Sequence, residues 1–167
     1  MTDKNNHKVT DTETRATAQD HHALRLWLRL LACTNLIEGH IRSRLRSQFE
    51  TTLPRFDLMA QLERSPEGLK MGELSKRMMV TGGNVTGITD QLVSEGLVVR
   101  EDNPGDRRAY IVKLTPKGRE TFSRMAAEHE KWIIEFFAGM KDLDRHQLLG
   151  LLAGLKSHMM TIKSDKD

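Results

Sequence analysis

The sequence has almost no cysteine and no long hydrophobic run. Cys33 is the only cysteine in the 167 residues, so no disulfide can form within the chain and a reducing cytoplasm is the expected setting. The longest apolar stretches, 28–33 and 148–155, are interrupted by Arg29, Gly150 and Gly154. Both are far shorter than the roughly 20 residues that a membrane helix needs. With no apolar run near Met1 to act as a secretory signal, we expect a cytoplasmic protein without a membrane span.

Aromatic residues and excess charge are also scarce. Aromatic residues make up 5% of the chain, and 26 Lys and Arg stand against 23 Asp and Glu. Between Pro54 and Gly118 there are ten Lys and Arg and nine Asp and Glu, a difference of +1. Any signal for nucleic-acid binding must therefore lie in where the charges are placed. The length and balance are typical of one helix-rich domain, with room for an oligomerisation element.

Residue patterns for metal binding or catalysis are missing as well. The seven histidines are scattered without metal-ligand spacing. A zinc site built on Cys33 and His40 would lack two ligands, so we expect Cys33 to be a buried thiol and His40 an ordinary side chain. No catalytic triad order, phosphate-cradling glycine loop or paired-carboxylate pattern stands out. We therefore expect no metal, no cofactor and no enzymatic activity.

The N-terminal third combines a polar tail with a long helix. Residues 1–20 have almost no apolar side chains, which predicts a disordered tail. Apolar residues spaced three or four apart predict one helix over 21–49. Its first half is apolar on a second side, which favours cover by a partner chain. The main stripe is Leu26, Leu30, Cys33, Ile37, Ile41, Leu45 and Phe49, and the second side is Leu24, Trp27, Leu28 and Leu31.

Three shorter helices follow. Pro54 suits the first turn of one helix, and 65–68 ends it. A short helix over 71–79 and a turn around Val80 and Thr81 lead to a third helix over 82–95, which Gly96 ends. Two short helices joined by a tight turn predict a helix-turn-helix. The inward stripe predicted for the third helix is Val85, Ile88 and Leu92.

The opposite face of that third helix has an unusual composition. Glycine costs about 1 kcal/mol relative to alanine inside a helix. One interpretation is a poorly optimised helix; the other is a bare face that approaches DNA closely, where Asn reads adenine and Thr contacts thymine. Asp90 fits the second interpretation poorly, because it repels phosphate unless it pairs with a nearby base. The predicted outward residues are Gly83, Thr86, Gly87 and Asp90, with Asn84 and Gln91 on the flanks.

A β-hairpin and two more helices complete the chain. Runs rich in β-branched residues at 97–100 and 109–114 predict strands around a turn at Pro104 and Gly105, which makes the helix-turn-helix a winged one. Thr115 is the expected N-cap of the next helix and Pro116 its first residue. The last helix, 144–163, has a seam that favours pairing with a second copy of the chain: Leu148, Leu152, Leu155, Met159 and Ile162.

From Leu74 to Gly118 the sequence closely resembles the MarR family of winged helix-turn-helix transcriptional regulators. The matching segments are LSKRMMVTGGNVTGITDQLVSEGLVVRE and DRRAYIVKLTPKG. The second segment contains the family's Asp-x-Arg wing element as Asp106 and Arg108, and its Leu-Thr-x-x-Gly element as Leu114, Thr115 and Gly118. With the flanking helices, the resemblance covers about 23–162.

The resemblance implies a mainly α fold with a small β-hairpin wing. The implied order is helix, helix, short strand, helix, helix, two hairpin strands, helix, helix. Residues 21–53 and 119–167 would form a helical dimerisation lobe, and 54–118 a winged lobe that binds DNA. The implied function is that of a homodimer on a near-palindromic double-stranded operator, usually as a repressor.

The family's DNA contacts can be transferred by position. Arg108 corresponds to the arginine that enters the minor groove, and Asp106 to the acid that braces it. Arg107, Lys76 and Arg77 are weaker candidates for phosphate contacts, which supply affinity while the helix face supplies sequence choice. The positions implied to meet the major groove are Thr81, Gly83, Asn84, Thr86 and Gly87.

The resemblance also implies a small-molecule effector, commonly an aromatic acid or related metabolite bound between the two lobes. Arg42, Arg44 and Arg46 are candidates to meet its anionic group, either a carboxylate or the phosphates of a thioester. Two alternatives stay open: a redox-responsive repressor that senses through Cys33, and a helical interaction module that does not bind DNA. The candidate lining residues are Trp27, Ile37, His40, Ile41, Phe56 and Met59.

Overall fold

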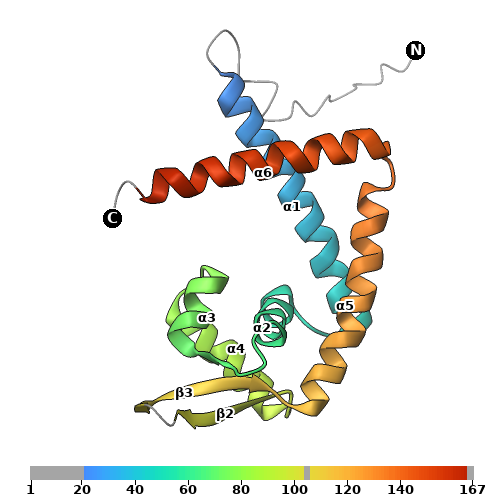
Figure 1. The fold of residues 1–167 in the computed structure, drawn as a ribbon. Helices are drawn as coiled ribbons and strands as arrows, with labels where there is room; N and C mark the ends of the chain where they lie inside the picture. The colour runs from blue at the N-terminus through green and yellow to red at the C-terminus, as the bar shows by residue number, and fades with distance from the viewer. Residues whose placement is uncertain (1–20, 104–105, 165–167) are drawn as a thin grey trace, which may run out of the picture. The chain divides into compact units, whose positions relative to one another are not determined.

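The structure is a computed structural model that describes residues 21–103 and 106–164 (Figure 1). Its side chains are described for 21–103 and 110–162, so the expected disordered tail and the turn at Pro104 and Gly105 lie outside the described residues. The predicted order of helices and strands is confirmed. The elements are α1 His22–Phe49, α2 Leu53–Glu63, β1 Leu69–Lys70, α3 Met71–Met78, α4 Gly82–Ser94, β2 Val98–Asn103, β3 Asp106–Leu114, α5 Pro116–Phe137 and α6 Asp142–Ser164.

The chain divides between Arg55 and Phe56 into two compact units. The first contains α1, the turn after it and the first residues of α2; the second contains the rest of α2 and all later elements. The expected grouping of 21–53 with 119–167 as one lobe therefore stays a prediction.

Within the first unit, α1 runs without a break until Glu50, which adopts the left-handed conformation at φ 51°. The N–H groups of Glu50 and Thr51 donate to the carbonyls of Arg46 and Leu45, at 3.2 and 3.3 Å. These bonds close the last turn of the helix and redirect the chain toward α2.

The two halves of α1 differ in burial. Ile41 and Leu45 are buried, whereas Leu26 and Trp27 are more than half exposed. Cys33, expected to be a buried thiol, is exposed. Of the predicted main stripe, Ile41 and Leu45 are buried, and most of the N-terminal half of α1 has no cover in the described chain.

The second unit begins with the helix-turn-helix. Met79, at φ 54°, ends α3, and the Ser75 hydroxyl donates to the Val80 carbonyl at 2.6 Å, so the turn before α4 is tight. Leu62 of α2, Leu74 of α3, and Val85 and Leu92 of α4 are almost fully buried. The predicted helix-turn-helix is confirmed.

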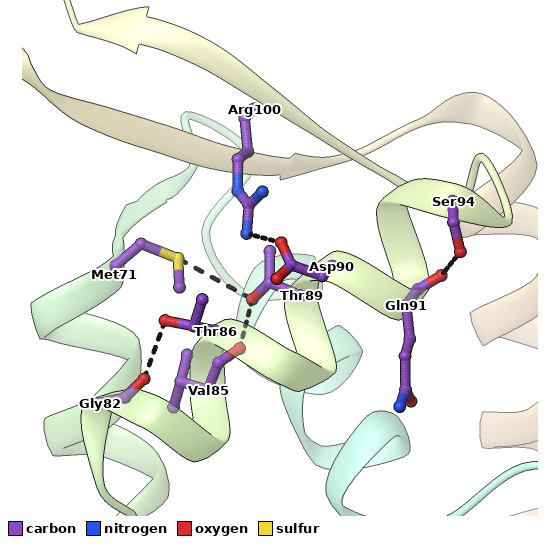
Figure 2. Close-up of polar contacts among 9 residues, drawn as sticks. All are labelled: Met71, Gly82, Val85, Thr86, Thr89, Asp90, Gln91, Ser94 and Arg100. Carbon is purple, nitrogen blue, oxygen red and sulfur yellow. Dashed lines mark hydrogen bonds and ion pairs between the residues drawn. The ribbon is translucent and has the colours of Figure 1, made fainter.

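One prediction about the inner face of α4 was wrong. Ile88 is half-buried, and Thr89 takes its place in the core with no exposed surface. The Thr89 hydroxyl donates to the Val85 carbonyl at 2.7 Å, which satisfies the buried polar group (Figure 2). A hydroxyl bonded within its own helix turn can therefore occupy a core position that the sequence pattern assigned to isoleucine.

The three strands form one antiparallel sheet in the order β1-β3-β2. Val98 pairs with Leu114 at one end of the hairpin, and Asn103 pairs with Asp106 at the other. The strands are longer than predicted because this pairing continues across polar residues toward the turn. The expected wing is confirmed as a hairpin of β2 and β3.

The start of α5 is held against the end of α4. The Thr115 hydroxyl accepts the Gly118 N–H at 3.0 Å and donates to the Gly96 carbonyl at 2.7 Å, so Thr115 is the N-cap that the sequence predicted. A side chain on Gly118 would overlap the carbonyl of Leu97. Glycine is therefore required there by close backbone approach, with Gly96 at φ 70° providing the turn.

Two further features concern α5 and α6. Phe56 packs against Phe122 and His129, with ring centroids 5.4 and 5.0 Å apart, and His129 meets Trp132 edge-on.

The described part of α6 has no buried residue, and Leu149, Leu151 and Met160 are each about two thirds exposed or more. None of the helices in the described ranges is long and apolar enough to cross a bilayer.

Candidate nucleic-acid interface

The outward face of α4 is bare and exposed. Asn84, Thr86 and Gly87 are exposed, as are Thr81 and Gly83 at the start of the helix. An ideal Cβ placed on Gly83 or Gly87 meets nothing within 4 Å. No packing within the described chain therefore requires glycine at either position, although glycine weakens a helix interior.

The polar groups of this face are partly engaged by the helix itself. The Thr86 hydroxyl donates to the Gly82 carbonyl at 2.9 Å, and the Ser94 hydroxyl to the Gln91 carbonyl at 2.7 Å (Figure 2). Thr86 consequently offers a methyl group and hydroxyl lone pairs, but no spare donor hydrogen. Such a side chain suits the apolar contact with a thymine methyl.

Asp90 lies on the same face and is paired. Its Oδ1 atom is 2.6 Å from a guanidinium nitrogen of Arg100, which reaches it from β2 (Figure 2). The pair neutralises the carboxylate, which removes the conflict with nearby phosphates that the sequence suggested. Sequence reasoning missed Arg100, because the contact joins two elements whose relative placement no local pattern reports.

The two basic residues near the end of α3 differ. Arg77 donates to Glu73 at 2.5 Å and to the Ser65 hydroxyl at 3.1 Å. The Lys76 ammonium has no such partner among the described residues and is exposed. Of the two predicted phosphate contacts, Lys76 is the more available.

The wing residues are only partly described. Asp106, Arg107 and Arg108 belong to β3 by their backbone. Their side chains lie outside the described residues, as does the turn at Pro104 and Gly105. The minor-groove role of Arg108 and its bracing by Asp106 stay predictions.

The predicted effector residues fall into separate places. Ile41 is buried in α1, Trp27 and His40 are exposed, and Phe56 and Met59 are core residues of the second unit. Arg42 and Arg46 line a cavity of about 430 Å³ within the first unit, whereas Ile37 and Arg44 do not line it. The complete lining is Arg42, Ser43, Arg46, Thr51, Thr52, Leu53 and Pro54.

Across the described ranges, no group of three or more His, Cys, Asp or Glu side chains is placed to hold a metal ion. The features that remain are a tight turn, an exposed helix after it, and a three-stranded sheet ending in a hairpin. Together they define a winged helix-turn-helix protein.

Comparison with known proteins narrows this class. A family model described as the MarR family matches residues 51–110. A MarR family transcriptional regulator from Silicibacter pomeroyi has a similar structure, with a TM-score of 0.73 and 32% identity over 86% of this chain and 99% of that one. The chain belongs to the MarR family. Sco3205 of Streptomyces coelicolor, a family member solved in complex with DNA, shares the fold at a TM-score of 0.72 and 23% identity, covering 86% of this chain and 90% of that one.

Curated relatives are named as regulators too. YkoM of Bacillus subtilis, an uncharacterized HTH-type transcriptional regulator, is 32% identical over 96 residues, 56% of this chain and 62% of that protein. The putative regulatory protein for the hcr operon of Thauera aromatica is 32% identical over 97 residues, 58% of each chain. The chain thus spans about three fifths of these two relatives. Their names agree with the expectation that the chain is not an enzyme.

Proposed function

We propose that the chain is a sequence-specific DNA-binding regulator of transcription. The observation that carries this proposal is the open glycine face of α4. Gly83 and Gly87 reduce helix stability without relieving any contact within the described part of the chain. The cost is explained if another surface must approach the helix backbone closely, and the major groove admits such a helix. The names of the relatives and the DNA complex of Sco3205 support the same function.

Each part of this surface has a distinct role in the proposal. The helix face from Thr81 to Gly87 reads the major groove, with Asn84 directed to adenine and Thr86 to thymine. Arg108 enters the minor groove from the wing with Asp106 as its brace, because a narrow minor groove has enhanced negative potential. Lys76, Arg77 and Arg107 contact phosphates.

The proposal includes a homodimer on a near-palindromic operator. The first half of α1 and the whole described part of α6 expose large apolar side chains, including Trp27, Leu36, Leu149 and Leu151. Faces of this kind mark protein interaction sites. A second copy of the chain is the proposed cover, and two-fold symmetry would then match two half-sites of DNA.

The finer part of the proposal is repression in the cytoplasm, relieved by an anionic small molecule such as an aromatic acid or its thioester. The support for an aromatic ligand is the resemblance alone, and the support for its negative charge is that Arg42 and Arg46 line one cavity. Redox release through Cys33 is the second candidate, and its support is that the thiol is exposed in the single chain, before the proposed second copy covers α1. If Cys33→Ser and the parent release DNA equally under peroxide, redox sensing is excluded.

The main test is a single substitution on α4 that should raise the stability of the fold and weaken DNA binding. An operator is first selected from a random-sequence duplex library, and affinity is then measured by fluorescence anisotropy. Gly87→Ala should raise the free energy of unfolding by up to about 1 kcal/mol, because alanine favours the helix. The same variant should bind the selected operator at least tenfold more weakly, because its methyl group occupies the face that meets the groove.

Gly39→Ala is the matched control. Gly39 lies inside α1, and its added Cβ also meets nothing within 4 Å. This variant should gain stability and keep the operator affinity of the parent. Retained affinity in Gly87→Ala, or failure of the parent to enrich any sequence, would contradict the proposal.

A further inference from the structure

The cavity after α1 has a wall made largely of hydrogen-bond donors. Arg42, Ser43 and Arg46 come from α1, and Thr51 and Thr52 from the turn that follows. All of its lining residues lie within the first unit, so the cavity does not depend on the second. Its volume of about 430 Å³ falls in the range of small-molecule sites.

Most of these donors have no partner. Within the described part of the chain, the side chains of Ser43, Arg46, Thr51 and Thr52 make no hydrogen bond or ion pair. Thr51 is 8% exposed, and its hydroxyl is not among the fully buried polar atoms that lack a partner, so the small exposed part of this residue includes the hydroxyl in the cavity wall. The donors of the wall are therefore open to a ligand that enters the cavity.

The charges favour an anion. Arg42 is paired with Glu38 at 2.5 Å, which offsets its charge but leaves other guanidinium N–H groups available. Arg46 is not offset by any described carboxylate within ion-pair distance. The first turn of α2 also borders the cavity through Leu53 and Pro54, and the N-terminal end of a helix has positive potential.

The number and arrangement of donors favour phosphate over carboxylate. Arginine binds either group with two parallel hydrogen bonds, but a carboxylate has only two oxygens to share. Three hydroxyls and two guanidinium groups around one space match the three terminal oxygens of a phosphate monoester. The lining contains no aromatic side chain that would stack on an aromatic acid.

We propose that this cavity binds the phosphate group of a small phosphorylated metabolite, recognised by Arg46, Arg42 and the Thr51 hydroxyl. Thr51 distinguishes this ligand from the DNA backbone, because a cavity residue that is only 8% exposed is reachable by a small molecule but not by a duplex. The bound phosphate fixes the turn through which the chain passes from α1 to α2. The effect on DNA release rests on the proposed function, whereas the binding itself does not.

The experiment measures pyrophosphate binding to the full chain by calorimetry, without DNA and at constant ionic strength set with chloride. Acetate and benzoate serve as carboxylate comparisons. Thr51→Val removes the hydroxyl at nearly constant volume, and Arg46→Met removes the charge. Each should weaken pyrophosphate binding about tenfold or more, and Arg25→Met, the same change elsewhere in α1, should not.

The possible results separate the two proposals. Pyrophosphate binding that is lost in Thr51→Val and Arg46→Met supports the site, even if the parent binds no DNA and the proposed function fails. Three results would overturn the proposed site: pyrophosphate does not bind in the chloride buffer, pyrophosphate binds all variants equally, or the chain prefers benzoate to pyrophosphate. A further result would also overturn the site: the parent binds DNA but not pyrophosphate, and the salt dependence of DNA binding is lower in Arg46→Met. That result would assign Arg46 to the DNA backbone instead.

Discussion

The carboxylate of Asp90 on α4 and the guanidinium of Arg100 on β2 form an ion pair at 2.6 Å, joining the outward helix face to the wing (Figure 2). Both side chains are partly exposed, at 56% and 29%. Exposed pairs of this kind contribute little to stability. The more important consequence is electrostatic, because the pair keeps a carboxylate neutralised on the face proposed to approach DNA.

Asp90→Asn tests that consequence. The free energy of unfolding should change by less than about 1 kcal/mol. Binding to a duplex of unrelated sequence should become tighter, and the slope of log affinity against log salt should steepen by about 0.9, because Arg100 is released for one phosphate. Anisotropy titrations at several salt concentrations measure both effects.

Glu101→Gln is the control for this prediction. It breaks the ion pair of Glu101 with Lys113, 2.9 Å apart, which involves the neighbouring position of β2. Since successive strand residues point to opposite faces of a sheet, this pair does not face α4. If Glu101→Gln tightens DNA binding as much as Asp90→Asn, the effect comes from net charge and not from Arg100.

A second prediction concerns the junction of α4 and α5. Gly118→Ala should lower the free energy of unfolding by about 1–3 kcal/mol or more, because its methyl group would overlap the Leu97 carbonyl. That carbonyl already accepts the Thr115 N–H at 3.1 Å, so it cannot move away without losing the bond. Urea unfolding at fixed protein concentration measures the loss, and Gly39→Ala, which fills open space, should show none.

The contrast between predicted and observed features follows from the range of the interactions. Gly96 and Thr115 were predicted correctly because helix ends depend on local backbone conformation and on bonds three residues apart. The sequence pattern did not predict that Thr89, and not Ile88, is the buried residue at this point of α4. The two positions are consecutive in the sequence, about 100° apart around the helix. The Thr89 hydroxyl is satisfied by a bond that hydrophobic periodicity ignores.

Longer-range features were less accessible. Arg100 meets Asp90 only after α4 and β2 have packed together, so no spacing within either segment reports the pair. Cys33 lies on an apolar stripe, but periodicity identifies a face to be covered without saying whether the same chain covers it. The cavity at Thr51 arises where α1 ends and the chain turns, a geometry set by the left-handed Glu50.

A third prediction tests the wing. Arg108→Ala should weaken operator binding by about 1–3 kcal/mol and relax sequence preference where the arginine inserts. Sedimentation should show an unchanged oligomeric state. Arg107→Ala, at the neighbouring predicted phosphate contact, should weaken binding to all sequences alike and reduce the salt slope by about 1. Unchanged operator binding in Arg108→Ala would exclude the assigned minor-groove contact.

The fourth prediction concerns pH and the aromatic cluster of the second unit. Burial lowers the pKa of His129 from its ordinary value of 6.5, because its ring packs against Phe56 and Trp132 and a charge there would lose hydration. The unfolded chain therefore binds a proton at a higher pH than the folded chain. The contribution of His129 to the free energy of unfolding should be fully present above about pH 6.5 and be lost as the pH drops through the lowered folded pKa.

In His129→Phe, which keeps a ring and removes the titration, the urea midpoint should fall less between pH 7.5 and 5 than in the parent. His158→Gln, which removes an exposed histidine, should leave the parent profile unchanged. Equal pH profiles for His129→Phe and the parent would mean that the half-buried His129 ring does not control this loss of stability.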